Sequence, residues 1–583
     1  MTGDTLKTAT PTDSGREIRY ADFSTFVEAL DYAADGATGM NFYSARGELL
    51  EVLTYADLRD QARVVAAQLL ALGLQPGDSV AMLAETHADF ARTFCGCLYA
   101  GLVPAPLPMP IAFGQRDAYS AQLRRIVNVA QARVVFATDE FAEWVAEAMA
   151  PMNLDWVGVL ADLPEVTGHV ETPSPDPESL AYLQFSSGTT GTPKGVAVTH
   201  RSMMANLQAI SLHGLKLRPH DRGVSWLPFY HDMGLVGCFL TPISTQFSAD
   251  YMSTRDFVRR PLMWLELISR NGGTITYAPS FGYDLALRRA RGKSLDGMDL
   301  STWRGAGIGG DMIKAPILRA FAETFADAKF SPTAFVPSYG MAETTLALTF
   351  APEGQGLVTQ RLDLGKLERE MVAAAPTEGA PARDFALCGP VLPGHKIEVR
   401  AEDGSLVADG KVGRIFAAGP SLMKEYYGDP EQTAACLSDD GWLDTGDLGY
   451  LSGGQIVITG RAKDLMIING RNLWPQDIEW SIETKVDAVR DGGAAAFSVT
   501  PDDQSGKVEE EVVVAIECRA RDAEAREAIR EEIHTLVRES HGVDARIVLA
   551  GNGELPKTSS GKLSRAKARI MYLDDLFDTG KTG

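Results

Sequence analysis

The pattern of apolar and polar positions in the first 170 residues alternates between two periods. Residues 55–72 and 87–100 have the spacing of amphipathic helices, and the first of these ends at Gly73. Short apolar runs between and after them predict buried strands at residues 79–84, 133–138 and 156–160. The proline-rich run at 101–110 predicts a turn. Strands and helices in this alternation are typical of a doubly wound, largely parallel α/β sheet.

The pattern changes twice further along the chain. From residue 391 it predicts short alternating strands, HKIEVR, GRIFAAG and GQIVITG, which favour a small β-rich barrel. After Gly460 the composition changes again, and the tail holds a strand, EVVVAIE, and a charged helix, DAEAREAIREEIHTLVRE. We therefore expect an N-terminal domain at residues 1–460 and a C-terminal domain at 461–583.

Composition excludes several classes of protein. Of 583 residues, 45% are apolar, which suffices for several cores, and a formal net charge of −22 argues against general nucleic-acid binding. The six cysteines lack metal-ligand spacing and are expected to be buried thiols. No apolar run reaches the roughly 18 residues of a membrane span, and the first residues lack the apolar core of a signal peptide. We expect a cytoplasmic protein with no nucleic-acid partner and no stable membrane insertion.

The richest candidate chemistry lies in FSSGTTGTPKGVAVTH, residues 185–200. Apolar runs on both sides predict strand, turn and strand. Its glycines let the backbone close on a polyanion, while N–H groups, hydroxyls and Lys194 offer donors to phosphate oxygens. The spacing is not that of a Walker A loop. A hairpin without a ligand could have the same composition.

Four further motifs follow in order: VPSYGMAETT (336–345), WLDTGDL (442–448), GRAKDLMIINGRNLWPQDIE (460–479) and LPKTSSGKLSR (555–565). Each has an ordinary interpretation. Asp447 could bond its own turn, Arg461 could be a surface charge, and Lys562 could be solvated. Together, in this order in one chain, those interpretations become improbable.

With these motifs, the chain resembles the adenylate-forming superfamily of acyl-CoA synthetases, peptide-synthetase adenylation domains and luciferases from about residue 24 to about 569. The branch it resembles best is the fatty acyl-AMP ligases. WLPFYHDMGL (226–235), alanine at 342, GRNLWPQDIE (470–479) and a long segment at about 351–386, where that branch carries an insertion, favour it. The resemblance implies an α/β fold. It has a large N-terminal domain of two doubly wound α/β subdomains plus a small β-barrel, and a mobile α+β C-terminal domain.

The resemblance also implies a reaction. A fatty acid would be activated by ATP to acyl-AMP with release of pyrophosphate, and the acyl group would pass to the phosphopantetheine thiol of an acyl carrier protein. ATP and Mg²⁺ are the implied cofactors. Lys562 would bridge the acyl carboxylate and the α-phosphate, Glu343 would hold Mg²⁺, and His231 would lie at the mouth of the acyl site. Lys463 and Asp464 would form the hinge. The implied nucleotide-binding residues are Ser186, Ser187, Gly188, Thr189, Thr190, Gly191, Lys194, Gly309, Gly310, Tyr339, Gly340, Thr344, Asp447 and Arg461.

Several features of the sequence have more than one interpretation. Ala342 lacks the hydroxyl that most relatives place near the α-phosphate, so Thr344 is a candidate substitute. A fatty acyl-CoA synthetase and a non-catalytic nucleotide-binding descendant are the alternative functions. The segment at 351–386 either packs and restrains the tail or is an idle loop. An acidic carrier protein would need a basic patch, and two groups qualify: Arg288, Arg289, Arg291 and Lys293, or Lys562, Arg565, Lys567 and Arg569.

Overall fold

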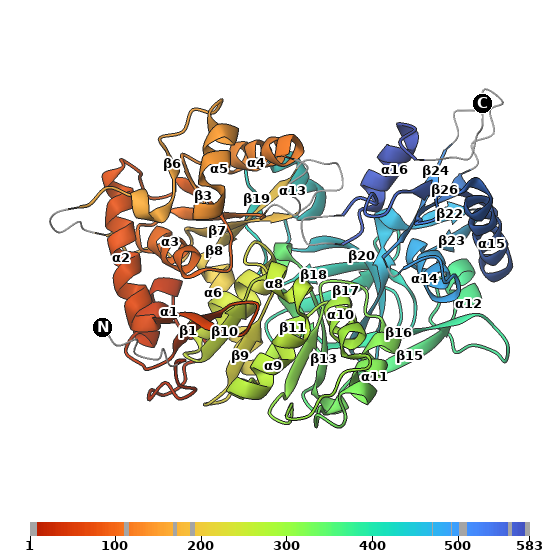
Figure 1. The fold of residues 1–583 in the computed structure, drawn as a ribbon, viewed down its shortest axis with the longest axis horizontal. Coiled ribbons are helices and arrows are strands. Elements are labelled where there is room, and N and C mark those ends of the chain that lie inside the picture. Colours follow the sequence, from red (N-terminus) through yellow and green to blue (C-terminus); the bar gives the residue numbers. More distant parts are fainter. Residues whose placement is uncertain are drawn as a thin grey trace.

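The chain folds into a large N-terminal α/β body, and a smaller C-terminal part packs against it (Figure 1). The computed structural model describes residues 9–109, 116–166, 172–186, 193–468, 470–490, 492–500, 510–557 and 562–577. Among the helices of these residues, none combines the length and apolarity that crossing a lipid bilayer requires.

The first part of the body is a four-stranded parallel sheet with helices between its strands. Its order is β4 (Val103–Leu107), β3 (Ser79–Leu83), β5 (Val134–Phe136) and β6 (Trp156–Gly158). The helices are α2 (Tyr55–Ala71), α3 (Ala88–Tyr99), α4 (Arg116–Ala130) and α5 (Ala142–Met149). The periodicities of the sequence predicted three of these strands and helices α2 and α3, and the structure confirms them.

The prediction of a turn at 101–110 is wrong, because strand β4 lies there. It is an edge strand that pairs only with β3 in its sheet. Pro104 and Pro106 are two residues apart, so both lack an N–H on the same side of the strand. An edge strand tolerates proline where that side has no neighbour in the ladder.

The second part is an eight-stranded, mostly parallel sheet. In order, its strands are β14 (Ala347–Phe350), β13 (Phe335–Gly340), β12 (Gly305–Ile308), β11 (Ile275–Ala278), β9 (Arg222–Ser225), β10 (Ser248–Met252), β1 (Gly39–Tyr43) and β2 (Leu49–Thr54). Neighbouring residues of β10 enter different cores: Tyr251 packs with α2 and α3, and Met252 packs with α9 (Leu262–Asn271), α10 (Ser280–Ala290) and α11 (Ala315–Thr324). Both faces of the sheet are therefore covered, as the doubly wound interpretation requires. The other helices of the body are α1 (Phe26–Ala33), α6 (His200–Gln208), α7 (Thr241–Ser244), α8 (Thr254–Arg259) and α13 (Pro430–Cys436).

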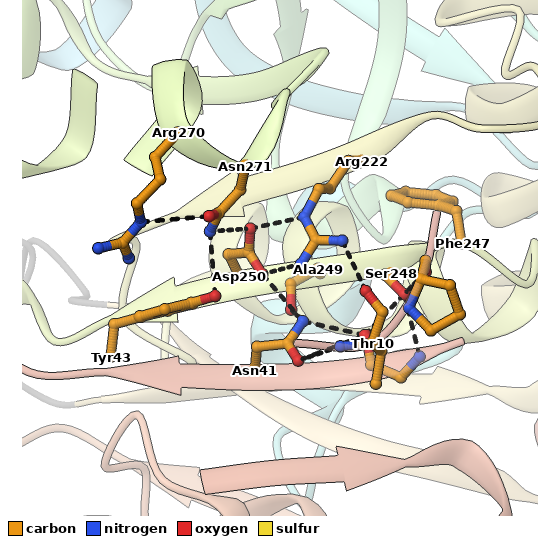
Figure 2. Close-up of polar contacts among 12 residues, drawn as sticks. Thr10, Asn41, Tyr43, Arg222, Phe247, Ser248, Ala249, Asp250, Arg270 and Asn271 are labelled. Carbon is orange, nitrogen blue, oxygen red and sulfur yellow. Dashed lines mark hydrogen bonds and ion pairs between the residues drawn. The ribbon is translucent and has the colours of Figure 1, made fainter. Parts of the chain in front are cut away.

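A buried polar cluster joins the N-terminal segment to this sheet (Figure 2). Arg222 and Asp250, on neighbouring strands, form an ion pair of 2.6 Å with side chains 4% and 0% exposed. Asn41 and Asn271 each donate to the Asp250 carboxylate at 2.9 Å. Arg222 also donates to the carbonyl of Thr10 at 2.8 Å. A buried ion pair needs such additional hydrogen bonds to offset its lost hydration.

The third part is a six-stranded antiparallel sheet, the β-rich region that the sequence predicted. Its order is β15 (Thr359–Asp363), β16 (Ala382–Pro390), β21 (Gln455–Arg461), β20 (Leu443–Ser452), β18 (Gly413–Ala418) and β17 (Lys396–Arg400). The segment at 351–386 supplies β15, α12 (Leu364–Glu370) and the start of β16. Leu362 and Leu367 of that segment are 3% and 0% exposed in one core with Leu448 and Trp474. The segment is thus packed, and the interpretation as an idle loop is wrong.

The C-terminal part is α+β. It contains a hairpin of β22 (Met466–Ile468) and β23 (Arg471–Leu473), and a three-stranded sheet of β24 (Ala494–Val499), β25 (Glu511–Glu517) and β26 (Ala545–Ala550). Its helices are α14 (Pro475–Lys485), α15 (Ala523–His541) and α16 (Arg565–Leu573). Ion pairs that join it to the body include Arg383 with Asp477, Lys314 with Glu483 at 3.0 Å, and Arg471 with Glu368 at 2.6 Å.

Candidate active site

A single large cavity, of about 2300 Å³, lies between the body and the C-terminal part. It brings together residues that the sequence motifs singled out from both parts of the chain. The predicted residues that line it are Lys194, His231, Gly309, Gly310, Tyr339, Gly340, Glu343, Asp447, Arg461, Lys463, Asp464 and Lys562. A cavity of this kind, with convergent polar groups, is the usual form of an active site.

The Gly/Thr motif forms a hairpin at the wall of this cavity. Strand β7 (Leu180–Ser186) pairs with β8 (Lys194–Thr199), which also pairs with β19 (Glu425–Tyr426). Lys194 donates to Gln432 at 2.8 Å, and its ammonium lies 4.4 Å from the centre of the Tyr426 ring. The predicted residues Ser187, Gly188, Thr189, Thr190 and Gly191 lie outside the described residues. For Ser186 the structure describes only the backbone, which pairs with Lys194.

Glu343 is a buried carboxylate on a short turn after β13. Tyr426 donates to its Oε1 at 2.8 Å, and burial together with this negative charge raises the pKa of Tyr426. Nowhere in the described part of the chain do three His, Cys, Asp or Glu side chains cluster as a metal site. The Glu343 carboxylate is the kind of ligand that Mg²⁺ takes, since proteins often hold this ion with one or two carboxylates plus phosphate oxygens of the substrate.

Asp447 links the next two predicted residues. Tyr339 donates to its Oδ2 at 2.8 Å, and the Arg461 guanidinium lies 3.2 Å from its Oδ1. Burial raises the pKa of Asp447, while Arg461 and the Tyr339 hydroxyl oppose that rise. A carboxylate has about four acceptor positions, so Asp447 retains capacity to accept from ribose hydroxyls.

The glycines after β12 and in β13 let neighbouring groups approach the backbone closely. Gly310 has φ of +75°, and a methyl group there would lie 2.7 Å from Met233 Cε and 3.7 Å from Lys562 Nζ. A methyl group at Gly340 would lie 1.8 Å from the carbonyl oxygen of Leu346. Neither position can hold a larger residue without a shift of its surroundings.

Thr344 corrects the prediction for nucleotide-binding residues. It is 0% exposed, it is not among the residues that line the cavity, and its hydroxyl donates to the carbonyl of Met341 at 2.9 Å. It follows Glu343 in a turn of 3₁₀ helix, where successive side chains project about 120° apart, so the two do not face the same way. Its hydroxyl stabilises the turn and cannot replace the one that Ala342 lacks.

Asp232 is a cavity residue that the sequence analysis did not single out. Its Oδ1 lies 2.7 Å from His231 Nδ1, although the two atoms are not aligned as a hydrogen bond. Burial raises the pKa of Asp232, but His231 and the Lys562 ammonium outweigh it and leave the pKa below its ordinary value. Asp232 is thus an ionised group between the histidine of the body and the lysine of the tail.

Arg565 is a second residue whose environment the sequence could not give. It pairs with Glu479 at 2.6 Å and with Asp464 at 3.0 Å. Arg565 therefore links α16 to α14 and to the predicted hinge, within the C-terminal part. Tyr426, the partner of Glu343, was missed because the run EYYGDP carries no recognisable signal.

Comparisons with known proteins agree with this geometry. A family model described as AMP-binding enzyme matches residues 42–427. The chain is 53% identical to a Caulobacter vibrioides protein named as an acyl-CoA synthetase, over 97% of this chain and 98% of that one. It is 33% identical to the long-chain-fatty-acid–AMP ligase FadD32 of Mycolicibacterium smegmatis, over 93% and 92%. It is 31% identical to the medium-chain-fatty-acid–[acyl-carrier-protein] ligase JamA of Moorena producens, over 96% of each.

Solved structures give the same result. One from studies of fatty acyl-adenylate ligases of E. coli and L. pneumophila has a TM-score of 0.91 and 45% identity, and covers 96% of this chain and 100% of that chain. The motifs, the cavity and these similarities agree. The chain belongs to the AMP-binding enzyme family and, within it, to the fatty acyl-AMP ligases.

Proposed function

We propose that this ligase, which forms acyl-AMP from ATP and a fatty acid, transfers the acyl group to the phosphopantetheine thiol of an acyl carrier protein. The observation that carries the proposal is the placement of Lys562, from the tail, in one cavity with Glu343, Tyr339 and Asp447 of the body. A cation brought in by a separate part of the chain can act in the first reaction and be withdrawn for the second.

The residues of the cavity have distinct roles in adenylation. Lys562 bridges the acyl carboxylate and the α-phosphate and neutralises charge that develops at phosphorus. The ionised Asp232 positions the Lys562 ammonium. Asp447 accepts from the ribose hydroxyls, and Tyr339 packs on the adenine. Holding two anions in line is mainly a matter of positioning and electrostatics.

Glu343 is the residue that would hold Mg²⁺, with Tyr426 orienting its carboxylate. The ion supplies charge neutralisation for the β- and γ-phosphates when it is bound. Lys194, beside Tyr426, approaches the same phosphates from the hairpin.

The acyl chain occupies the apolar end of the cavity, beyond His231. Apolar residues of the cavity lining on this side include Trp226, Leu227, Cys238, Ile275, Phe281 and Leu285. Apolar side chains of this kind suit an aliphatic chain.

The contact between the segment at 351–386 and the tail supports a carrier protein as acceptor. Glu368 of α12 binds Arg471, and its carbonyl accepts from Asn472 at 3.1 Å. These bonds stabilise the pose in which Lys562 lies in the cavity and so disfavour the pose that would admit free CoA. The relative JamA, named as an acyl-carrier-protein ligase, supports the same acceptor.

The second candidate is a fatty acyl-CoA synthetase, which the name of the Caulobacter relative favours. A product assay distinguishes the two. The protein is incubated with ATP, Mg²⁺ and a ladder of fatty acids, with either CoA or a holo acyl carrier protein as acceptor. We expect acyl-AMP alone with CoA and acylated carrier with the holo protein. Efficient acyl-CoA synthesis would favour the second candidate.

A further inference from the structure

A strongly basic surface lies beside the active-site cavity. Residues 255–293 contain eight basic and three acidic side chains, in a chain whose net charge is −22. We define the basic rim as the members of this set that gather where α8, α9 and α10 meet. They are Arg255, Arg259, Arg260, Arg288, Arg289 and Lys293, and all six are exposed.

We propose that the basic rim is the surface on which the acidic carrier protein docks to receive the acyl group. This inference rests on the proposed function, because it requires a carrier protein as acceptor. Opposite charges on the two surfaces would steer the encounter and set the orientation.

The first support is a pocket of about 390 Å³ within the rim, separate from the active-site cavity. Arg259, Arg260, Arg289 and Lys293 surround it, with Glu266 as its one acidic residue. Its floor is apolar, made of Leu262, Met263, Leu295 and Met298. A cationic wall over an apolar floor suits an acidic helix that carries a few apolar side chains.

The second support is that four charges of the rim have no carboxylate nearby among the described residues. Arg255 pairs with Glu140 and Arg288 with Asp284, but in the described chain no carboxylate lies within 4.0 Å of Arg259, Arg260, Arg289 or Lys293. Arg289 also donates to the backbone carbonyl of Arg259 at 3.3 Å, which ties α10 to α8 within the rim. Four exposed cations without a nearby carboxylate repel one another and attract an anionic partner.

The third support is the position of the basic rim beside the active-site cavity. Arg255, Arg259 and Arg288 of the rim also line the large cavity, and Arg259 lines the small pocket as well, so the rim borders both. A carrier held on the rim would have its phosphopantetheine arm beside the entrance. The rim belongs wholly to the N-terminal body, and it therefore keeps its place relative to the acyl-adenylate if the tail moves.

The second basic group of the tail does not form a comparable surface. Lys562 lines the cavity, and Arg565 is held by Glu479 and Asp464. Arg569 donates to the carbonyl of Ser498 at 3.0 Å. Of that group, Lys567 and Arg569 alone are exposed.

The test uses the double variant Arg289→Glu/Lys293→Glu, because neither residue lines the active-site cavity. The matched control is Lys216→Glu/Lys396→Glu, which makes the same change of charge at two exposed lysines outside both pockets. Three rates are measured: acyl-AMP formation trapped with hydroxylamine, acyl transfer to free pantetheine, and acyl transfer to a holo acyl carrier protein of strongly negative net charge.

We expect the rim variant to lose about tenfold or more in kcat/KM for the carrier and to lose most of its salt dependence. The other two rates, and all rates of the control, should stay at the level of the unaltered protein. Equal kcat/KM for the carrier in the rim variant and the control would overturn the proposal. A further assay measures acyl-AMP formation from fatty acid bound to anionic vesicles. A parallel fall of that rate in the rim variant would also overturn the proposal and would assign the rim to an anionic membrane surface.

Failure of the proposed function looks different. In that case the unaltered protein forms acyl-AMP and acylates CoA but not the carrier. The acceptor is then wrong, and the docking assignment falls with it.

Discussion

The hydroxyl of Tyr426 donates a hydrogen bond of 2.8 Å to Oε1 of Glu343, across 83 positions of sequence. The bond joins the hairpin β7–β8, through its third strand β19, to the turn after β13. It orients a buried carboxylate that has few other donors. A mutation of Glu343 alone would change both the charge of the carboxylate and its orientation, whereas a mutation of Tyr426 changes only the orientation.

Glu343→Gln removes the charge and preserves the shape. Because the charge is what attracts Mg²⁺, we expect a large loss of adenylation at low Mg²⁺ that excess metal partly restores. Tyr426→Phe keeps the charge and releases its orientation, so its defect should be smaller and should depend less on Mg²⁺. Titration of the adenylation rate against Mg²⁺ in both variants checks this. If both curves shift alike, the metal role of Glu343 is wrong.

Asp447→Ala and Tyr339→Phe test the nucleotide side. Loss of the Asp447 carboxylate should raise the KM for ATP by about tenfold or more, since a hydrogen bond to a charged group contributes about 1.5–3 kcal/mol. Tyr339→Phe keeps the ring and removes only its bond to Asp447, so we expect a change of a few-fold. Initial rates at varied ATP give both values. A Tyr339→Phe defect as large as that of Asp447→Ala would contradict these separate roles.

Lys562→Ala tests the group that the tail supplies. Removing one electrostatic donor of the transition state should lower the adenylation rate by roughly 10²–10³-fold, while ATP binding stays nearly unchanged. Lys485→Ala, at an exposed lysine of the same part of the chain, is the control. Pyrophosphate exchange measures the rate, and calorimetry measures ATP binding. Near-normal acyl-AMP formation would remove Lys562 from the mechanism.

The contact of Glu368 with Arg471 tests the restraint on the tail. Deleting residues 351–386 would remove strand β15 and the buried Leu362 and Leu367, so a milder change is required. We expect Glu368→Ala/Arg471→Ala to raise acyl-CoA formation by roughly fivefold to tenfold, because an ion pair contributes on the order of 1 kcal/mol to the preferred pose. Arg361→Ala should show no such gain, because its ion pair of 3.6 Å with Asp384 stays within the segment and does not reach the C-terminal part.

Two buried histidines should make the free energy of unfolding depend on pH. Burial lowers the pKa of His200, and likewise of His541, to about 4 from an ordinary value of about 6.5. Both are neutral in the folded protein, and below pH 6.5 each takes up a proton when the protein unfolds. Their contribution to the free energy of unfolding is therefore complete above pH 6.5 and is lost as the pH falls toward 4. Denaturant midpoints from pH 7 to pH 4 should fall, and His200→Asn should show a shallower fall. An unchanged slope in that variant would exclude His200 as a source.

Local sequence patterns predicted much of the fold. The helical spacing of residues 55–72 and the apolar run at 79–84 gave α2 and β3 nearly to the residue. Strand β4 was missed because proline is a breaker in most strands, and only the sheet order shows that Pro104 and Pro106 face a free edge. That order depends on contacts distant in sequence, which periodicity does not contain.

The candidate site was less accessible to sequence reasoning. Motifs identified Glu343, Asp447 and Lys562, which the structure places around one cavity. They could not show that Thr344 is buried away from it, because successive side chains of a 3₁₀ turn project about 120° apart. They also missed Tyr426 and Asp232, which acquire their importance only from neighbours brought in by the fold.

The buried cluster around Arg222 and Asp250 has a consequence for handling the protein (Figure 2). Thr10 is 5% exposed; its carbonyl accepts from Arg222, and its N–H donates to Asn41 at 2.8 Å. Thr10 is therefore an interior residue, although it lies far from the cavity residues in sequence. A protease site placed just after Thr10 should stay uncut in the native protein, and an affinity tag or fused domain should be joined upstream of residue 9.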